Sequence, residues 1–156
     1  MIANLILLAH IAATWFMVGI IWLVQCVHYP LFDRVESSGF TQFESDHQAW
    51  IFPLVGPGML VEALTAALLL WYRPSSIPLW LPLVGLALIA VNWISTALVQ
   101  IPLHETLAQN GFQPDAHAKL VSSNWLRTAA WTLRGILALA MLLYPLSQTT
   151  PPPPAA

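Results

Sequence analysis

The sequence predicts an all-α protein, a four-helix transmembrane bundle. The first observation is composition: of 156 residues, 58% are hydrophobic and only 8% are charged, whereas a soluble domain carries about 25% charged residues. The second is a set of four apolar segments, each long enough to cross a hydrocarbon layer, which takes about 20 helical residues. The third is that tryptophan and tyrosine residues stand near the segment ends, where amphipathic rings favour the membrane interface.

The four spans are expected at residues 2–27, 52–72, 78–101 and 120–144. The first lacks a basic leading region and exceeds the roughly 7–15 apolar residues of a signal peptide, so it is predicted to be a retained helix that stops before Pro30. The few residues after Arg73 predict a tight turn, which makes the second and third spans an antiparallel hairpin. The membrane domain is therefore assigned to residues 1–146, and the Pro-rich tail, residues 147–156, is expected to be disordered.

Two longer connections join the remaining spans. Residues 38–51 place aromatic residues and His47 at helical spacing, with acidic residues elsewhere around the turn, which predicts a short interfacial helix between the first two spans. The stretch from Pro102 to Ala118 is expected to be a loop, because Gly111 and Pro114 break helices.

An even number of spans puts both termini on one side of the membrane and both longer connections on the other. That other side collects most of the acidic residues and four histidines, and is called the histidine face here. The basic residues are too balanced to fix the orientation, and the termini are assigned to the cytoplasm of a cell (inner) membrane protein. The net charge of −2 gives no indication of a nucleic-acid partner. A lone cysteine, Cys26, excludes an internal disulfide.

Two opposite charges stand near mid-membrane. Glu62 is close to the middle of the second span and Arg134 close to the middle of the fourth, with Thr14 and Asn92 at a similar depth. A charge at the bilayer centre costs about 2.5–3.5 kcal/mol on insertion scales. We therefore expect Glu62 and Arg134 to face each other inside the bundle. Two interpretations stay open: a structural clamp that fixes helix register, or a proton or ligand role.

Polar residues also recur at spacings of three and four along three spans. Because unpaired polar groups are costly in hydrocarbon, these stripes are expected to face a common interior that opens towards the histidine face. They would include His104 if the third helix tolerates Pro102. The stripes are Thr14, Gln25 and His28 on the first span, Asn92, Thr96, Gln100 and His104 on the third, and Asn124, Arg127, Trp131 and Arg134 on the fourth.

Four histidines at the histidine face are candidate metal ligands, because neutral imidazole with carboxylate suits iron, copper or zinc. They are His28, His47, His104 and His117, and haem is an alternative occupant. No pair has the His-x-x-x-His spacing of a strong metal motif, so simple polar anchors at the interface are the competing interpretation. Glu62, Arg127 and Arg134 are the candidate catalytic residues.

Two further features are interpreted from their positions in the spans. His10, at the terminal end of the first span, is expected to be a helix-packing residue. The Gly56-Pro57-Gly58 sequence indicates either close helix packing or a broken turn that lines an entrance above Glu62.

The last third of the chain resembles a known pattern. The stretch from Gln100 to Leu107 is similar to the N-x-P-x-N-x-x-L motif of the anthrone-oxygenase-like membrane family, and Asn124 to Thr128 resembles the entry to that family's fourth helix. The resemblance covers residues 98–144, and this sequence has Gln100 and His104 where the family has asparagines. It implies a four-helix membrane protein and, by analogy with the family's named activity, oxidation of a polycyclic anthrone to an anthraquinone.

Three functions remain open from sequence. The first is an oxidoreductase acting on a hydrophobic small molecule, in which the histidines bind metal or transfer protons, Glu62 acts as base or ligand, and the arginines hold charge. The second is a binding or transport module for a small molecule or a proton, which with only four helices would call for a homo-oligomer. The third is a structural subunit of a membrane complex. All three place the chain in a lipid bilayer.

Overall fold

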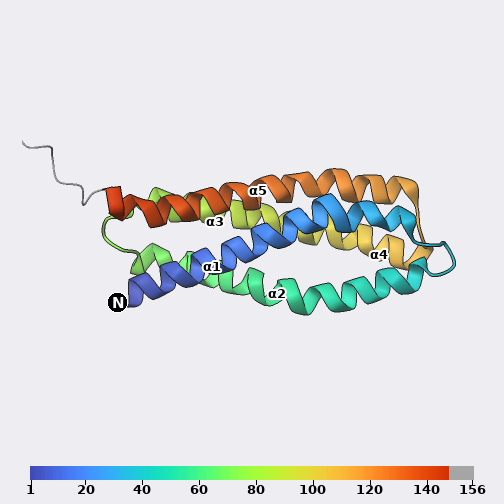
Figure 1. Cartoon of the computed structure of the whole chain (residues 1–156), viewed down its shortest axis with the longest axis horizontal. Coiled ribbons are helices and arrows are strands. Elements are labelled where there is room, and N and C mark those ends of the chain that lie inside the picture. Colours follow the sequence, from blue (N-terminus) through green and yellow to red (C-terminus); the bar gives the residue numbers. More distant parts are fainter. Residues whose placement is uncertain (148–156) are drawn as a thin grey trace, which may run out of the picture.

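The computed structural model describes residues 1–147, with side chains up to Tyr144, and confirms an all-α bundle. Four long, nearly continuous helical rods make up the bundle. Figure 1 shows them packed side by side along one axis, with the N-terminus and the end of α5 at the same end. Each rod is long and apolar enough to cross a membrane: Ile2–Arg34, Phe40–Tyr72, Trp80–Asn110 and Pro114–Tyr144. The chain is therefore an integral membrane protein. Ser147 ends α5, and the rest of the predicted tail lies outside the described residues.

The first rod is longer than predicted. It runs through α1 (Ile2–Leu23), the π-helical segment η1 (Val24–His28) and the 3-10 segment η2 (Tyr29–Arg34). The prediction that it stops before Pro30 was wrong, because Pro30 stands at the start of η2, where a missing N–H leaves no hydrogen bond unmade. The Tyr29 N–H bonds back to the Val24 carbonyl, five residues earlier, which is the wider π spacing.

The third rod also has a π-helical segment directly before a proline. It consists of α3 (Trp80–Ser95), the π-helical segment η3 (Thr96–Gln100) and α4 (Ile101–Asn110), so the loop predicted from Pro102 was wrong. The Ile101 N–H bonds to the Thr96 carbonyl, and Pro102 follows directly. A proline ring clashes with the carbonyl four residues earlier in a regular helix. A widened turn just before each proline relieves that clash, and the rod continues until Gly111, whose φ of 76° only glycine adopts readily.

The second rod is a single helix, α2 (Phe40–Tyr72), with Pro53 and Pro57 inside it. The predicted separate interfacial helix at residues 38–51 was wrong, since those residues form the first turns of α2. The prolines remove two backbone donors without interrupting the helix, so the broken turn considered at residues 56–58 does not occur either. A Cβ on Gly58 would lie 2.9 Å from Met17 Sδ, which confirms close packing of α1 on α2 there.

The fourth rod, α5 (Pro114–Ser147), packs against the first and third rods. The rods have 31 or 33 residues, which at about 1.5 Å per residue spans roughly 47–50 Å, more than the roughly 30 Å of hydrocarbon. The terminal end is apolar from Ile2 onwards, whereas the acidic residues gather near the connections at the opposite end. The rods therefore project from the hydrocarbon layer at the histidine face.

Candidate functional site

The mid-membrane charges form a closed network. Arg134 Nε donates to Glu62 Oε1 at 2.9 Å, and its Nη2 lies 2.9 Å from the same oxygen. The second carboxylate oxygen accepts a hydrogen bond from Trp131 Nε1 at 3.0 Å. Arg134 also donates to the Gly85 carbonyl at 2.5 Å and to Thr14 Oγ1 at 3.4 Å. The predicted pairing of Glu62 with Arg134 is confirmed, and the network ties all four rods together.

The other residues predicted near this layer behave differently. Asn92 is buried, but neither atom of its side-chain amide has a hydrogen-bond partner among the described residues. His10 is buried and its Nδ1 lies 3.0 Å from Thr65 Oγ1, which confirms the packing role expected for it.

Near the histidine face, a carboxylate, an imidazole and a phenol form a chain. Glu44 Oε1 lies 2.5 Å from His104 Nδ1, and His104 Nε2 lies 2.9 Å from the Tyr29 hydroxyl. A carboxylate accepts only, so Nδ1–H donates to Glu44; in a neutral imidazole the other nitrogen, Nε2, then accepts from the Tyr29 O–H. Gln48 Nε2 donates to Glu44 at 3.3 Å and to the His104 carbonyl at 3.2 Å. Glu44 and Tyr29 are buried.

The four predicted metal ligands divide into a group of three and one outlier. His28 Nε2 lies 2.8 Å from His47 Nδ1, and the His47 ring centroid is 5.0 Å from that of His104. His28 is half-buried. His117 instead donates from Nε2 to the Tyr29 carbonyl at 2.7 Å and stacks on Phe32, so it positions the backbone of Tyr29.

The ring nitrogens of these histidines form hydrogen bonds within the protein, and their arrangement is not that of ligands around an ion. Two imidazole nitrogens bound to one zinc at about 2.0–2.1 Å cannot also share a hydrogen bond of 2.8 Å, as those of His28 and His47 do. Both ring nitrogens of His104 are occupied by Glu44 and Tyr29. Among the described residues, no group of three or more His, Cys, Asp or Glu side chains is arranged to hold a metal. A metal site stays a prediction that would require these rings to rearrange.

Arg127 brings a buried cation to the same place. Its Nη1 donates to Asn124 Oδ1 at 2.9 Å, and Asn124 in turn donates to Gln25 Oε1 at 2.9 Å. The guanidinium lies over the Trp131 ring, 5.1 Å from its centroid, and interacts electrostatically with the Tyr29 side chain. Its Nε has no hydrogen-bond partner in the described part of the chain. The expectation that the polar stripes face the interior is thus confirmed on the first, third and fourth rods.

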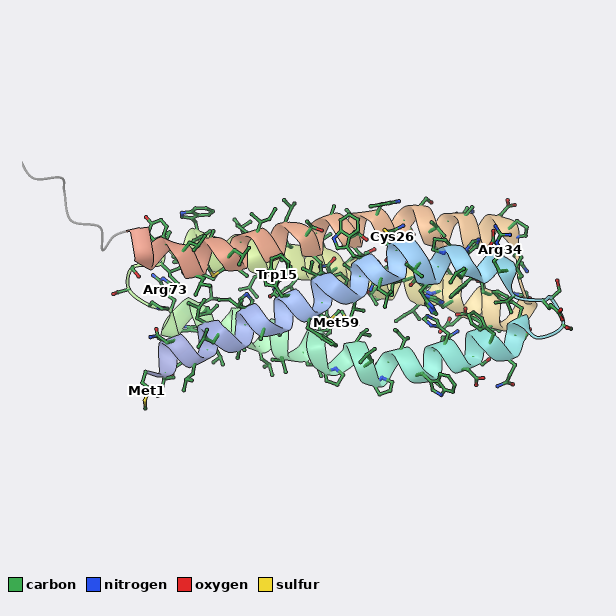
Figure 2. All side chains as sticks on the ribbon, viewed as in Figure 1. Met1, Trp15, Cys26, Arg34, Met59 and Arg73 are labelled. Carbon is green, nitrogen blue, oxygen red and sulfur yellow. The ribbon has the colours of Figure 1, made fainter. Side chains whose placement is uncertain are left out.

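A cavity of about 720 Å³ lies against these groups. Most of its wall is apolar and comes from α1, α2, η3 and the adjoining part of α3; Met59, labelled in Figure 2, points from α2 towards α1 and belongs to this wall. The polar part of the wall is Tyr29, His47, Gln48, Thr96, Gln100, His104 and Arg127. A volume within the roughly 300–1,000 Å³ range of small-molecule sites, mostly apolar with a few convergent polar groups, is typical of a ligand pocket.

Sequence reasoning did not single out Tyr29, Glu44 or Gln48 as site residues. Glu44, His47 and Gln48 stand at spacings of three and four on one helix and so share one face, but the sequence prediction put the acidic residues elsewhere around the turn from His47. Tyr29 directly follows a π-helical turn, a feature that often marks functional sites and that only the Pro30 next to it could have indicated.

Comparisons with known proteins add no relative: no family model, no curated protein and no solved structure matches this chain. The resemblance in residues 98–144 accordingly has no support beyond its own motifs. The fold and the site define a class, an integral membrane protein of four helices with a buried polar and histidine network beside an apolar cavity.

Proposed function

We propose that this protein binds a hydrophobic small molecule with a weakly acidic oxygen group, such as a phenol or enol, and exchanges a proton with it. The observation that carries the proposal is the composition of the cavity wall. An apolar chamber meets a single polar end, where a buried cation and a carboxylate–imidazole–phenol chain converge.

Arg127 would hold the oxygen. Its Nε is buried without a partner among the described residues, and its Nη1 is fixed by Asn124. A fixed cation in a water-poor site stabilises an oxyanion far more strongly than one in water. Arg127 therefore favours the deprotonated form of a bound phenol or enol.

The proton would pass through Tyr29. The ligand O–H gives its proton to the Tyr29 oxygen while the Tyr29 proton moves to His104 Nε2, 2.9 Å away. This leaves a ligand oxyanion beside Arg127 and an imidazolium beside the Glu44 carboxylate, so no charge is created without a partner. The reverse sequence protonates the ligand.

Oxidation of a hydrophobic small molecule is a narrower form of this proposal. It requires an electron acceptor in addition to proton transfer. Elemental and absorbance analysis of detergent-purified protein, with His28→Ala and His104→Ala variants, tests for it: stoichiometric metal or a haem band lost in the variants supports oxidoreductase chemistry. Glu62 and Arg134 we assign to a structural clamp rather than to catalysis, because all of their bonds are made within the bundle.

The binding experiment uses 1-hydroxypyrene, a lipophilic phenol, with pyrene as the matched compound that lacks the hydroxyl. Protein reconstituted in phosphatidylcholine nanodiscs should show saturable energy transfer from tryptophan to 1-hydroxypyrene, since Trp93 and Trp131 line the cavity. The absorbance of bound 1-hydroxypyrene should change from phenol to phenolate at a lower pH than in protein-free nanodiscs.

Arg127→Gln should weaken 1-hydroxypyrene binding about tenfold, because a hydrogen bond to a charged group contributes about 1.5–3 kcal/mol and 1.4 kcal/mol is a factor of ten. Pyrene binding should not change. Lys119→Gln, which removes an exposed cation outside the cavity, is the control. Equal affinities for the two compounds in wild-type protein, or an unaltered affinity in Arg127→Gln, would rule out the assigned role.

A further inference from the structure

The cavity is open at its side. The backbone of α2 packs against α3 nearer the terminal end and against α4 nearer the histidine face, but not against η3, which lies between them. Four cavity-lining side chains along this gap, two on α2 and two on the third rod, are exposed on the outer surface of the bundle: Phe52, Leu60, Trp93 and Ile101. A side chain that lines a cavity and is also exposed stands on the rim of an opening.

The opening faces hydrocarbon rather than water. Leu60 lies 12 residues before the end of α2 at Tyr72, about 18 Å along the helix, and Phe52 lies about 30 Å from that end at 1.5 Å per residue. With the apolar terminal end at one membrane surface, Leu60 lies in the half of the roughly 30 Å hydrocarbon layer nearer the histidine face, and Phe52 lies at the far boundary of that layer. The exposed surface of this layer is apolar, as lipid contact requires.

The chemistry of the cavity changes along the same axis. Its deep wall includes Met59 and Trp93, whereas His47 and His104 stand beyond the level of Phe52, nearer the aqueous end. A lipid leaflet has the same gradient, with apolar tails inside and polar groups at its surface. An amphiphile already dissolved in the leaflet therefore has the orientation that the cavity would give it.

We propose that the ligand enters sideways from the membrane leaflet at the histidine face, through the opening between α2 and η3. This rests on the proposed function, because the occupant is the same weakly acidic amphiphile. Gly56 and Ala97 are the smallest of the lining residues that α2 and η3 contribute to the opening. Small side chains there leave the opening wide, and a compact polycyclic or aliphatic body passes between the rods without turning over.

The test narrows the opening without touching the polar wall. Gly56→Trp and Ala97→Trp each place a large ring at the rim, from opposite rods, so one can serve if the other fails to fold. A Cβ at Gly56 would meet only Phe52 at 3.8 Å, so the position accepts a side chain. Leu54→Trp and Ile94→Trp are matched controls, since both residues are exposed on the same rods but do not line the cavity.

Dissociation is followed in nanodiscs preloaded with 1-hydroxypyrene, by the loss of energy transfer after excess 1-naphthol is added. Each rim variant should slow dissociation at least tenfold while its equilibrium affinity stays within about threefold of wild type, and the controls should match wild type. Wild-type rates in both rim variants would overturn the lateral entrance and leave the proposed binding intact. An absence of saturable binding in wild-type protein, as when bulk lipid chains fill the cavity, would overturn both.

Discussion

Two polar layers cross this bundle, and they differ in how completely their charged groups are paired. In the mid-membrane layer, both oxygens of Glu62 and all three nitrogens of Arg134 have partners, and among the described residues of that layer the neutral amide of Asn92 is left without them. In the layer at the histidine face, Glu44 Oε2, Gln100 Oε1 and Arg127 Nε are buried without hydrogen-bond partners in the described chain. The first layer adjoins packed side chains, whereas the second adjoins a cavity.

This difference in pairing fits the two proposed roles, a structural clamp for the mid-membrane layer and ligand binding for the layer at the histidine face. Unpaired charged groups are especially expensive in a membrane interior, so a layer that serves only to fix helix register should have its charges fully paired. A layer that binds a ligand keeps some hydrogen-bonding atoms unpaired, so that they can bond to the ligand in the cavity. Trp131 links the two layers, because it donates to Glu62 and lies beneath the Arg127 guanidinium.

The largest expected effect comes from breaking the ion pair of the mid-membrane layer. Arg134→Gln or Glu62→Gln leaves a buried charge without its partner and should lower the free energy of unfolding by about 3–5 kcal/mol. Denaturant titration in lipid–detergent bicelles measures it. Arg34→Gln is the control, because Arg34 pairs with Asp33 at an exposed site and should change stability by less than about 1 kcal/mol. A Glu62→Gln protein of wild-type stability that no longer binds 1-hydroxypyrene would reverse the assignment of the two layers.

Trp131→Phe tests whether Trp131 couples the two polar layers. The ring that lines the cavity is largely kept, but the hydrogen bond to the Glu62 carboxylate is lost, which should destabilise the protein by about 1.5–3 kcal/mol. Affinity for 1-hydroxypyrene should fall less than in Arg127→Gln, because only part of the cation–π contact with Arg127 is removed. Trp125→Phe, at an exposed position on α5, is the control. A loss of affinity larger than that of Arg127→Gln would show that the layers are not separable.

Two neighbouring glycines contrast the packed and the open side of α2. Gly58→Ala puts a methyl group 2.9 Å from Met17 Sδ and 3.0 Å from Phe16 Cε1, and should destabilise the protein by about 1–3 kcal/mol. Gly56→Ala meets nothing closer than 3.8 Å and should be neutral or stabilise by up to about 1 kcal/mol through helix propensity. The same unfolding titration compares them. Equal destabilisation by both would mean that α2 is packed tightly at the cavity as well.

Sequence predicted the four rods, the pairing of Glu62 with Arg134 and the inward direction of the polar stripes. Depth and periodicity fix these, since hydrocarbon penalises any other arrangement. It misplaced the ends of the first and third rods, because a proline indicates a helix end unless a π-helical turn precedes it, and the formation of that turn depends on packing. The sequence also predicted two helices where the structure has α2 alone, because amphipathic spacing at residues 38–51 is the same for a separate surface helix and for the start of a long helix.

For the site, sequence identified His28, His47, His104 and Arg127 but not the bonds among them. Whether four histidines bind an ion or each other depends on distances of a few tenths of an ångström, which spacing along separate helices does not determine. His117 shows this most clearly: it has the same residue type and a position at the same face, yet it bonds to a backbone carbonyl. Glu44 was missed because an acidic residue on an amphipathic helix is usually solvated.

The smallest expected effect on stability, and the most specific effect on chemistry, belongs to Glu44→Gln. The amide oxygen can still accept from His104 and Gln48, so the free energy of unfolding should change by less than about 1 kcal/mol. The negative charge beside His104 is lost, however, and an imidazolium there is no longer stabilised. Bound 1-hydroxypyrene should therefore show less phenolate at neutral pH than in wild-type protein, as its absorbance spectrum reports. Asp46→Asn removes the same charge from the same helix outside the cavity and should leave the spectrum unchanged. More phenolate in Glu44→Gln than in wild type would mean that Glu44 acts on the ligand only by repulsion, and the proton path through Tyr29 and His104 would be wrong.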